Sequence, residues 1–166
     1  MKKLLCVFVL FAMTFNLQAQ EPKTSEADQE RKARTLELMG QKIEIDIDTS
    51  LFMEVTVNTY ISESPRAVVM AMMVPDSYAV TKQRMNENTD PQFKISEKGE
   101  TEMNGVNVLY MKGTSMAEGS TLDSEMYCMA IDDETCLMVI GMVEQNADAK
   151  YSEAIKKAIN SVIKKK

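Results

Sequence analysis

The stretch that decides the fold is residues 136–143, which read CLMVIGMV. This run is apolar on both faces, which is typical of a central strand that is covered on at least one side. A helix pattern follows over residues 151–163, where apolar residues recur at spacings of three and four, and Asn146 is the expected N-cap. The stripe consists of Tyr151, Ile155, Ala158, Ile159 and Val162. The apolar strand and the helix that follows it together predict a sheet with the C-terminal helix packed over one face.

Upstream of that strand, the chain reads as a meander of antiparallel strands. Asn104-Gly105 is a strong signal for a two-residue hairpin turn, and it separates the alternating run that begins at Phe93 from residues 106–115. Residues 122–131 then return to the central strand through an acidic turn at residues 132–134. The sequence therefore predicts a four-stranded meander against which the C-terminal helix packs.

The first half of the chain predicts a hairpin, two more strands and a shorter middle helix. Residues 35–39 and 42–48 alternate around a turn at Gly40-Gln41, and residues 52–60 and 66–74 are rich in β-forming residues. The middle helix is expected over residues 77–87, with Asp76 as its N-cap and Asp90-Pro91 ending the region. The fold class is thus α+β: an antiparallel β-sheet (hairpin plus C-terminal meander) packed by a C-terminal helix and a shorter middle helix.

The first residues predict export. Lys2 and Lys3 precede an apolar run over residues 4–13, and Ala19 offers a small residue for cleavage, which is the pattern of a signal peptide. We therefore expect a signal peptide at residues 1–19, a flexible polar lead-in at residues 20–34, and a single domain at residues 35–166. The apolar run is too short for a membrane span, so the expected product is periplasmic or secreted and has no stable span after cleavage.

Composition narrows the chemistry. The 166 residues carry a formal net charge of −6 and contain no histidine. An acidic chain repels phosphate backbones, so nucleic acid is not an expected partner. Without histidine, Ser-His-Asp hydrolases, Cys-His nucleophiles and His-ligated zinc or haem are all excluded. No catalytic or cofactor-binding motif is recognisable, and we therefore expect no enzyme and no cofactor.

Sulfur-bearing side chains are the compositional oddity, because the chain has 15 methionines. By the period-two rule, one face of the last strand and of the strand before it collects several of them. That face carries Cys136, Met138, Ile140 and Met142 on the last strand, with Met126 and Cys128 on the neighbouring strand. Thioether and thiolate sulfur suit Cu(I), which is one interpretation. Methionine is also a flexible core filler, and that interpretation is favoured here and for Met70, Met72 and Met73.

Cys128 and Cys136 are the only cysteines after Cys6, and they form a candidate disulfide. An odd loop, such as residues 131–133, places them opposite each other on one face. An even loop, such as residues 132–133, places them on opposite faces and forbids the bond. The turn does not decide between these registers, so the disulfide stays open.

Two charged patterns and one short motif are expected to be structural. Glu44, Asp46 and Asp48 form an acidic ladder that is too linear for a calcium cage, so we expect a solvated face. The same interpretation applies to the acidic turn at residues 132–134. Residues 161–164 match the serine–lysine spacing of penicillin-binding enzymes, but the companion motifs are missing and coincidence explains the match.

The order of elements resembles the PsbP-like family at the level of pattern. The resemblance rests on the early run at residues 42–52, the hairpin at residues 103–106, and the final strand and helix at residues 136–143 and 151–163. It implies a domain that acts as an assembly or binding module, and it transfers no functional residue. The favoured function is an exported non-catalytic module for an unknown protein or small molecule. The alternatives are a copper-binding or redox protein, and an enzyme with a carboxylate-only site.

Overall fold

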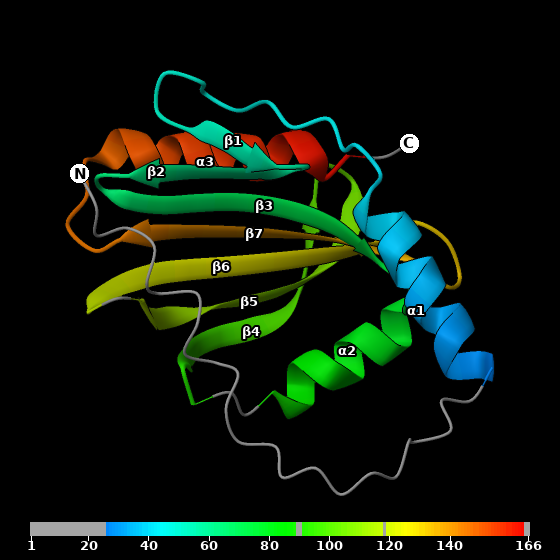
Figure 1. Ribbon diagram of the computed structural model, residues 1–166. Coiled ribbons are helices and arrows are strands. Elements are labelled where there is room, and N and C mark those ends of the chain that lie inside the picture. The colour runs from blue at the N-terminus through cyan, green and yellow to red at the C-terminus, as the bar shows by residue number, and fades with distance from the viewer. Residues whose placement is uncertain (1–25, 89–90, 118, 165–166) are drawn as a thin grey trace, which may run out of the picture.

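The computed structural model describes residues 26–88, 91–117 and 119–164, and the signal peptide expected at residues 1–19 lies outside them. Seven antiparallel strands form one sheet in the order β1-β2-β3-β7-β6-β5-β4 (Figure 1). The strands are β1 Met53–Thr56, β2 Thr59–Glu63, β3 Arg66–Val74, β4 Phe93–Met103, β5 Val106–Ala117, β6 Ser120–Ala130 and β7 Cys136–Glu144. The helices are α1 Glu26–Met39, α2 Tyr78–Glu87 and α3 Ala149–Val162. The predicted α+β class is confirmed.

The C-terminal half follows the prediction closely. β4 to β7 form the expected meander, and β7 occupies the centre of the sheet between β3 and β6. Helix α3 lies along one face against β7 and β3, with the predicted stripe buried in a shared core (Figure 1). Its N-cap is Asp148, whose side chain accepts a hydrogen bond from Lys150 N, whereas the predicted cap Asn146 has a left-handed backbone in the preceding turn.

Gly141 explains why α3 sits so close to the sheet. It lies in the middle of β7 and on the face that α3 covers, and a Cβ built there collides with the Ile155 side chain. Glycine in a strand interior often marks such a close approach. The glycine therefore fixes the distance between the helix and the central strand.

Helix α2 lies on the opposite face and makes a second, smaller core. Met85 of α2 packs with Leu109 and Met111 of β5 and with the two cysteines. The predicted helix is confirmed but its cap is Ser77, whose side chain accepts from Val80 N. The expected cap, Asp76, instead forms an ion pair with Arg31 at 2.9 Å and another with Arg84.

The predicted N-terminal hairpin is wrong. Residues 35–39 belong to α1, because the alternating run also consists of helix formers, and Gly40 ends that helix by donating to the carbonyls of Leu36 and Glu37. Helix α1 also begins inside the stretch expected as a lead-in, and it packs beside β3. A five-residue alternation is too short to distinguish a strand from the end of a helix.

Residues 42–48 are extended but pair with no strand of the sheet among the described residues. Their isoleucines do turn inward, since Ile43 is buried and the other two pack against the α3 core. The backbone is held by side chains instead of a ladder: Ile43 N donates to Asn58 Oδ1 at 2.8 Å and Asp46 N to Ser161 Oγ at 2.9 Å. The alternation predicted burial correctly and the hydrogen-bonding partner incorrectly.

The strand expected over residues 52–60 is interrupted. Asn58 has a positive φ of 59° and turns the chain between β1 and β2. Its buried side chain also donates to the Gln41 carbonyl at 2.7 Å while accepting from Ile43. One asparagine thus makes the turn and anchors the irregular segment, which an alternating pattern does not reveal.

Candidate functional site

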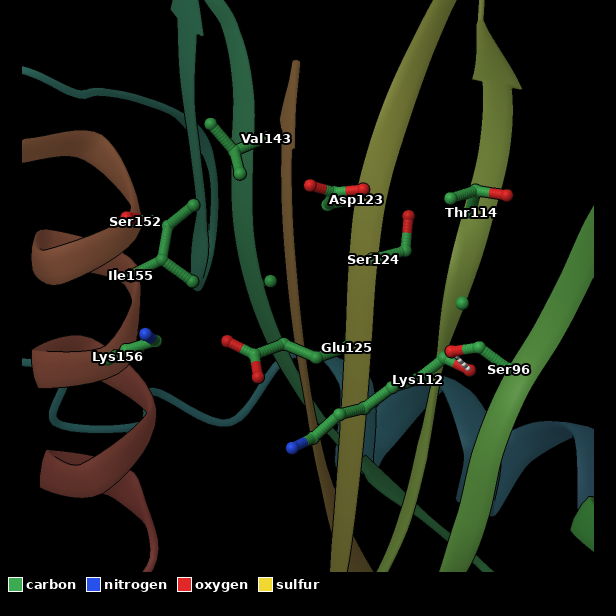
Figure 2. A pocket seen from close by; sticks show the side chains of 12 residues that line it. Ser96, Lys112, Thr114, Asp123, Ser124, Glu125, Val143, Ser152, Ile155 and Lys156 are labelled. Carbon is green, nitrogen blue, oxygen red and sulfur yellow. Dashed lines mark hydrogen bonds between the residues drawn. The ribbon is translucent and has the colours of Figure 1, made fainter. Parts of the chain in front are cut away.

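A hollow of about 350 Å³ opens between α3 and strands β5 and β6. Figure 2 shows Glu125 and Lys112 extending from these strands toward the helix, where Lys156 and Ser152 lie on the facing side. Val143, Ile155 and the backbone of Gly141 form the apolar floor of the hollow. The volume lies in the range of small-molecule pockets, which combine apolar walls with a few polar groups.

The alternation of β6 places the acidic groups of the hollow. Asp123 and Glu125 point to the same face as Tyr127 and Met129, which is the face that α3 covers. Lys112 on β5 is the cross-strand partner of Glu125 in the register. Lys156 reaches the hollow from the exposed flank of α3, one residue after the buried Ile155. Four charged groups from three elements therefore surround one apolar floor.

The hydrogen bonds of these groups leave capacity for a ligand. Glu125 Oε2 accepts from the Tyr127 hydroxyl at 3.1 Å, and Asp123 Oδ1 accepts from Gln145 Nε2 at 2.8 Å. Lys112 Nζ lies 4.0 Å from Glu97 Oε2 and 5.6 Å from the Tyr110 ring centroid. The Lys156 ammonium has no hydrogen-bond or ion-pair partner among the described residues. Both signs of charge are thus available.

The pKa of the Tyr127 hydroxyl lies far above its ordinary value. Burial of the ring is the main cause, and the negative charge of the nearby Glu125 carboxylate adds to it. The phenol therefore stays protonated and keeps donating to Glu125. This hydrogen bond holds the Oε2 atom of the Glu125 carboxylate beside the phenol at the hollow.

The three serine hydroxyls around the hollow are occupied by other partners. Ser96 Oγ donates to the Lys112 carbonyl at 3.2 Å (Figure 2), Ser152 Oγ to the Ala149 carbonyl at 2.8 Å, and Ser124 shares a hydrogen bond of 2.8 Å with Ser115. A serine nucleophile requires a base within hydrogen-bond reach. The contacts seen here are instead those of structural hydroxyls.

A second hollow, of about 230 Å³, lies on the opposite face of the sheet. Its apolar lining includes Met126 of β6 and Met142 of β7, together with Phe93 at the start of β4. Helices α1 and α2 gather over the half of this face where β3 ends (Figure 1). Met126 and Met142 are half-buried here and Met116, which also lines the hollow, is 60% exposed, so these methionines are not sealed in a core.

The predicted sharing of one face by Cys136, Met138, Ile140 and Met142 is confirmed, as is that of Met126 and Cys128. That face lies away from α3, however, and only part of it is a core. Of the other methionines, Met73 packs on the α3 side and Met129 is buried there, whereas Met70 and Met72 are half-buried on the open face. The core interpretation therefore holds for some of the methionines only.

Cys128 and Cys136 are both buried free thiols beneath α2. The loop between β6 and β7 spans residues 131–135, and the register pairs Cys136 with Ala130 and Cys128 with Met138. The two thiols therefore share one face and interact across a diagonal. This contact raises the pKa of Cys128, which burial raises further, and lowers the pKa of Cys136. Their disulfide stays a prediction.

The acidic ladder and the acidic turn are exposed, as expected. The ladder is partly paired, since Lys157 lies 3.0 Å from Asp46 and Lys164 lies 3.6 Å from Glu44. In the turn, Glu134 pairs with Arg34 of α1 at 2.7 Å. Ser161 donates to the Ala158 carbonyl at 2.6 Å and accepts from Asp46 N, so it has a structural role.

Sequence reasoning missed the hollow beneath α3. The available signal was the pair Asp123 and Glu125, which alternation places on the same face as the buried Tyr127 and Met129. Charged residues on the helix-covered face of a strand indicate either a satisfied network or a site. No sequence pattern indicated that Lys112 and Lys156 would lie at the same hollow, because their proximity depends on how α3 packs on the sheet.

Comparison with known proteins gives the fold and little more. No family model matches the chain, and no curated protein is significantly similar in sequence. The crystal structure of LpqN from Mycobacterium tuberculosis, a protein involved in cell envelope biogenesis, superposes with a TM-score of 0.53 at 10% identity, covering 70% of this chain and 79% of that one. Protein PA94 of Pseudomonas aeruginosa, of unknown function, gives a TM-score of 0.48 at 14% identity over 76% and 86% of the two chains.

No helix within the described part of the chain is long and apolar enough to cross a membrane.

Proposed function

We propose that this protein is an exported, non-catalytic binding module that takes a small zwitterionic ligand, such as a free amino acid or a short peptide, in the hollow beneath α3. The observation that carries this proposal is the arrangement of Glu125 and Asp123 against Lys112 and Lys156 around an apolar floor. A ligand with both an ammonium and a carboxylate group would meet both signs of charge there.

The charges assign an orientation to such a ligand. Its ammonium would face Glu125 and Asp123 on β6, since each of these carboxylates accepts one side-chain hydrogen bond within the described part of the chain. Its carboxylate would face Lys156, whose ammonium is unpaired among the described residues. A small apolar side chain would rest on Val143 and Ile155. Burial in this hollow strengthens both charge contacts relative to open water.

Support for export comes from the N-terminal pattern of two lysines, an apolar run and Ala19. LpqN provides an example of a related fold in a protein of cell envelope biogenesis. Kinship with the PsbP-like family is part of the same proposal, because that family supplies binding and assembly modules. A cleaved leader is tested by the N-terminal sequence of the protein recovered from an exporting cell.

Binding is tested by calorimetric titration of the purified protein with free amino acids and dipeptides. We expect saturable binding of at least one zwitterion and a loss of about tenfold or more in affinity for E125Q, because one charge contact is worth about 1.5–3 kcal/mol. E102Q is the matched control, since Glu102 is an exposed strand carboxylate on the other face. Equal affinities of E125Q and E102Q, or no saturable binding, would contradict the proposal.

A carboxylate-only enzyme is the second candidate, because Asp123 and Glu125 line one hollow, as that alternative requires. The two functions make different predictions for D123N and E125Q. In an enzyme, either variant abolishes turnover of a bound compound, whereas in a binding module the compound is recovered unchanged. Mass spectrometry of the ligand after prolonged incubation with the wild-type protein decides between them.

A further inference from the structure

The face of the sheet opposite α3 gathers sulfur atoms around two buried thiols. Cys128 and Cys136 are fully buried, at 0% exposure, and lie diagonally opposite each other on the β6–β7 pair. Met138 is the direct cross-strand partner of Cys128, and residues directly opposite each other have Cβ atoms about 4.5–5.5 Å apart. The register alone therefore places two cysteines and one methionine at adjacent positions of one face.

The thiols lie among mainly apolar side chains, with the Tyr78 ring packed against them and the Asp76 carboxylate near enough to act on both. Thr81 of α2 is 4% exposed, and its hydroxyl interacts with both cysteines. Among the described residues it has no hydrogen-bond partner of good geometry, and a buried polar atom in that state is rare in folded proteins. A polar side chain thus points into the sulfur cluster without a satisfactory acceptor.

The donor set selects the kind of ion. The described residues contain no group of three His, Cys, Asp or Glu side chains that could hold a metal, so neither a zinc site nor an oxygen cage is formed there. Thiolate and thioether sulfur are the ligands that a soft monovalent cation prefers. Two thiolates suffice for a two-coordinate ion, and Met138 would supply a third, neutral ligand.

Sulfur also extends from the buried thiols to the open hollow. Met126 precedes Cys128 by two residues and Met142 follows Met138 by four, so all four share the same face. Met126 packs against the cluster around the thiols and also lines the open hollow with Met142. A soft ion arriving from solvent would meet thioethers before it reached the thiols.

We propose that Cys128 and Cys136, with Met138 as a third ligand, form a binding site for Cu(I), and that the methionines of the open hollow are its entrance. On binding, each thiol transfers its proton to solvent as its sulfur bonds to the ion. The ion stays in its +1 state, so no oxidant or reductant is consumed. This site is independent of the hollow beneath α3, and each can fail without the other.

The test is an anaerobic titration of the reduced full-length protein with Cu(I) against a chromophoric Cu(I) chelator. We expect one Cu(I) per chain and a shift of the copper to the chelator when either C128S or C136S is used. M138L conserves volume and removes the thioether, and it should weaken binding by about tenfold, as loss of a supporting group at a metal site does. M129L is the matched control, because Met129 is a buried methionine of the same strand on the α3 side.

A second measurement guards against variants that fold poorly. X-ray absorption at the copper edge of the wild-type complex should show only sulfur neighbours, two or three in number. Nitrogen or oxygen neighbours, copper affinity that C128S and C136S leave unchanged, or a wild-type protein isolated with these cysteines joined in a disulfide would each overturn the proposal.

Discussion

The two faces of the central strand β7 differ in a way that separates stability from binding. On the α3 side, Val139 and Gly141 lie against the buried stripe of the helix, and the packing is tight enough that Gly141 admits no side chain. On the other side, Met138 and Met142 are half-buried, and helices cover only part of the face. The comparison indicates that the α3 face stabilises the fold, whereas the methionine face tolerates change.

The largest expected effect is on the α3 face. Ile155 is 2% exposed and contacts the sheet at Gly141, so I155A removes buried methyl groups and leaves a cavity. We expect a loss of about 2–5 kcal/mol in the free energy of unfolding. Urea denaturation measures it, and an effect no larger than that of M142A would show that the two faces do not differ.

A smaller loss is expected when a side chain is added at the same contact. G141A places a methyl group against Ile155 and should cost about 1–3 kcal/mol through overpacking. G40A is the control, because a Cβ there meets only ordinary contacts at 3.6 Å. If thermal melting shows G141A to be as stable as G40A, then α3 is not held at the distance that the structure shows.

The methionine face should be more tolerant. Met142 is half-buried and lines the open hollow, so M142A should lower the free energy of unfolding by about 1 kcal/mol, roughly half the transfer free energy of a fully buried side chain. A loss as large as that of I155A, measured in the same denaturant series, would identify the face as a sealed core in solution.

The smallest expected effect on the free energy of unfolding comes from Tyr78 of α2, and it appears at high pH only. Burial, followed by the hydrogen bond to Glu100, raises the pKa of Tyr78 to about 12. Above its ordinary pKa of about 10, the unfolded tyrosine loses its proton while the folded one keeps it, so the folded state becomes less stable as the pH rises. The stabilising contribution is present below pH 10 and is lost between pH 10 and 12.

The variant Y78F lacks the ionisable hydroxyl of Tyr78 but keeps the other tyrosines. Unfolding of the wild-type protein and of Y78F is therefore compared at pH 9, 10 and 11. The wild-type protein should lose more stability over that interval. Parallel curves for the two proteins would show that Tyr78 is as solvated in the folded state as in the unfolded one.

The C-terminal half of the fold could be predicted from sequence, because its signals are long and mutually consistent. The run at residues 136–143, the Asn104-Gly105 turn and the stripe of α3 each specify one structure, and each was confirmed. In the N-terminal half, the strand at residues 66–74 and the middle helix were also predicted, whereas the region before residue 60 was not, because its alternating runs are short. Asn58 and Gly40 redirect those runs through side-chain and capping hydrogen bonds that periodicity does not contain.

The candidate sites were less accessible to prediction than the fold. The sulfur face followed from period-two spacing, but whether helices cover it depends on where α1 and α2 pack. The hollow beneath α3 depends on how that helix packs over the sheet, and it brings Lys112 into one site with Lys156, 44 positions away in sequence. Only the tertiary arrangement makes such residues neighbours.

The proposed binding site is tested most directly by amide NMR of the purified protein during titration with a panel of free amino acids. We expect one or more of them to shift amide signals at residues 123–125 of β6 and 152–156 of α3 together, with a common saturation curve, and to leave the methionine face unchanged. Shifts confined to the methionine face, or scattered shifts that do not saturate, would contradict the assignment of the hollow beneath α3 as the binding site.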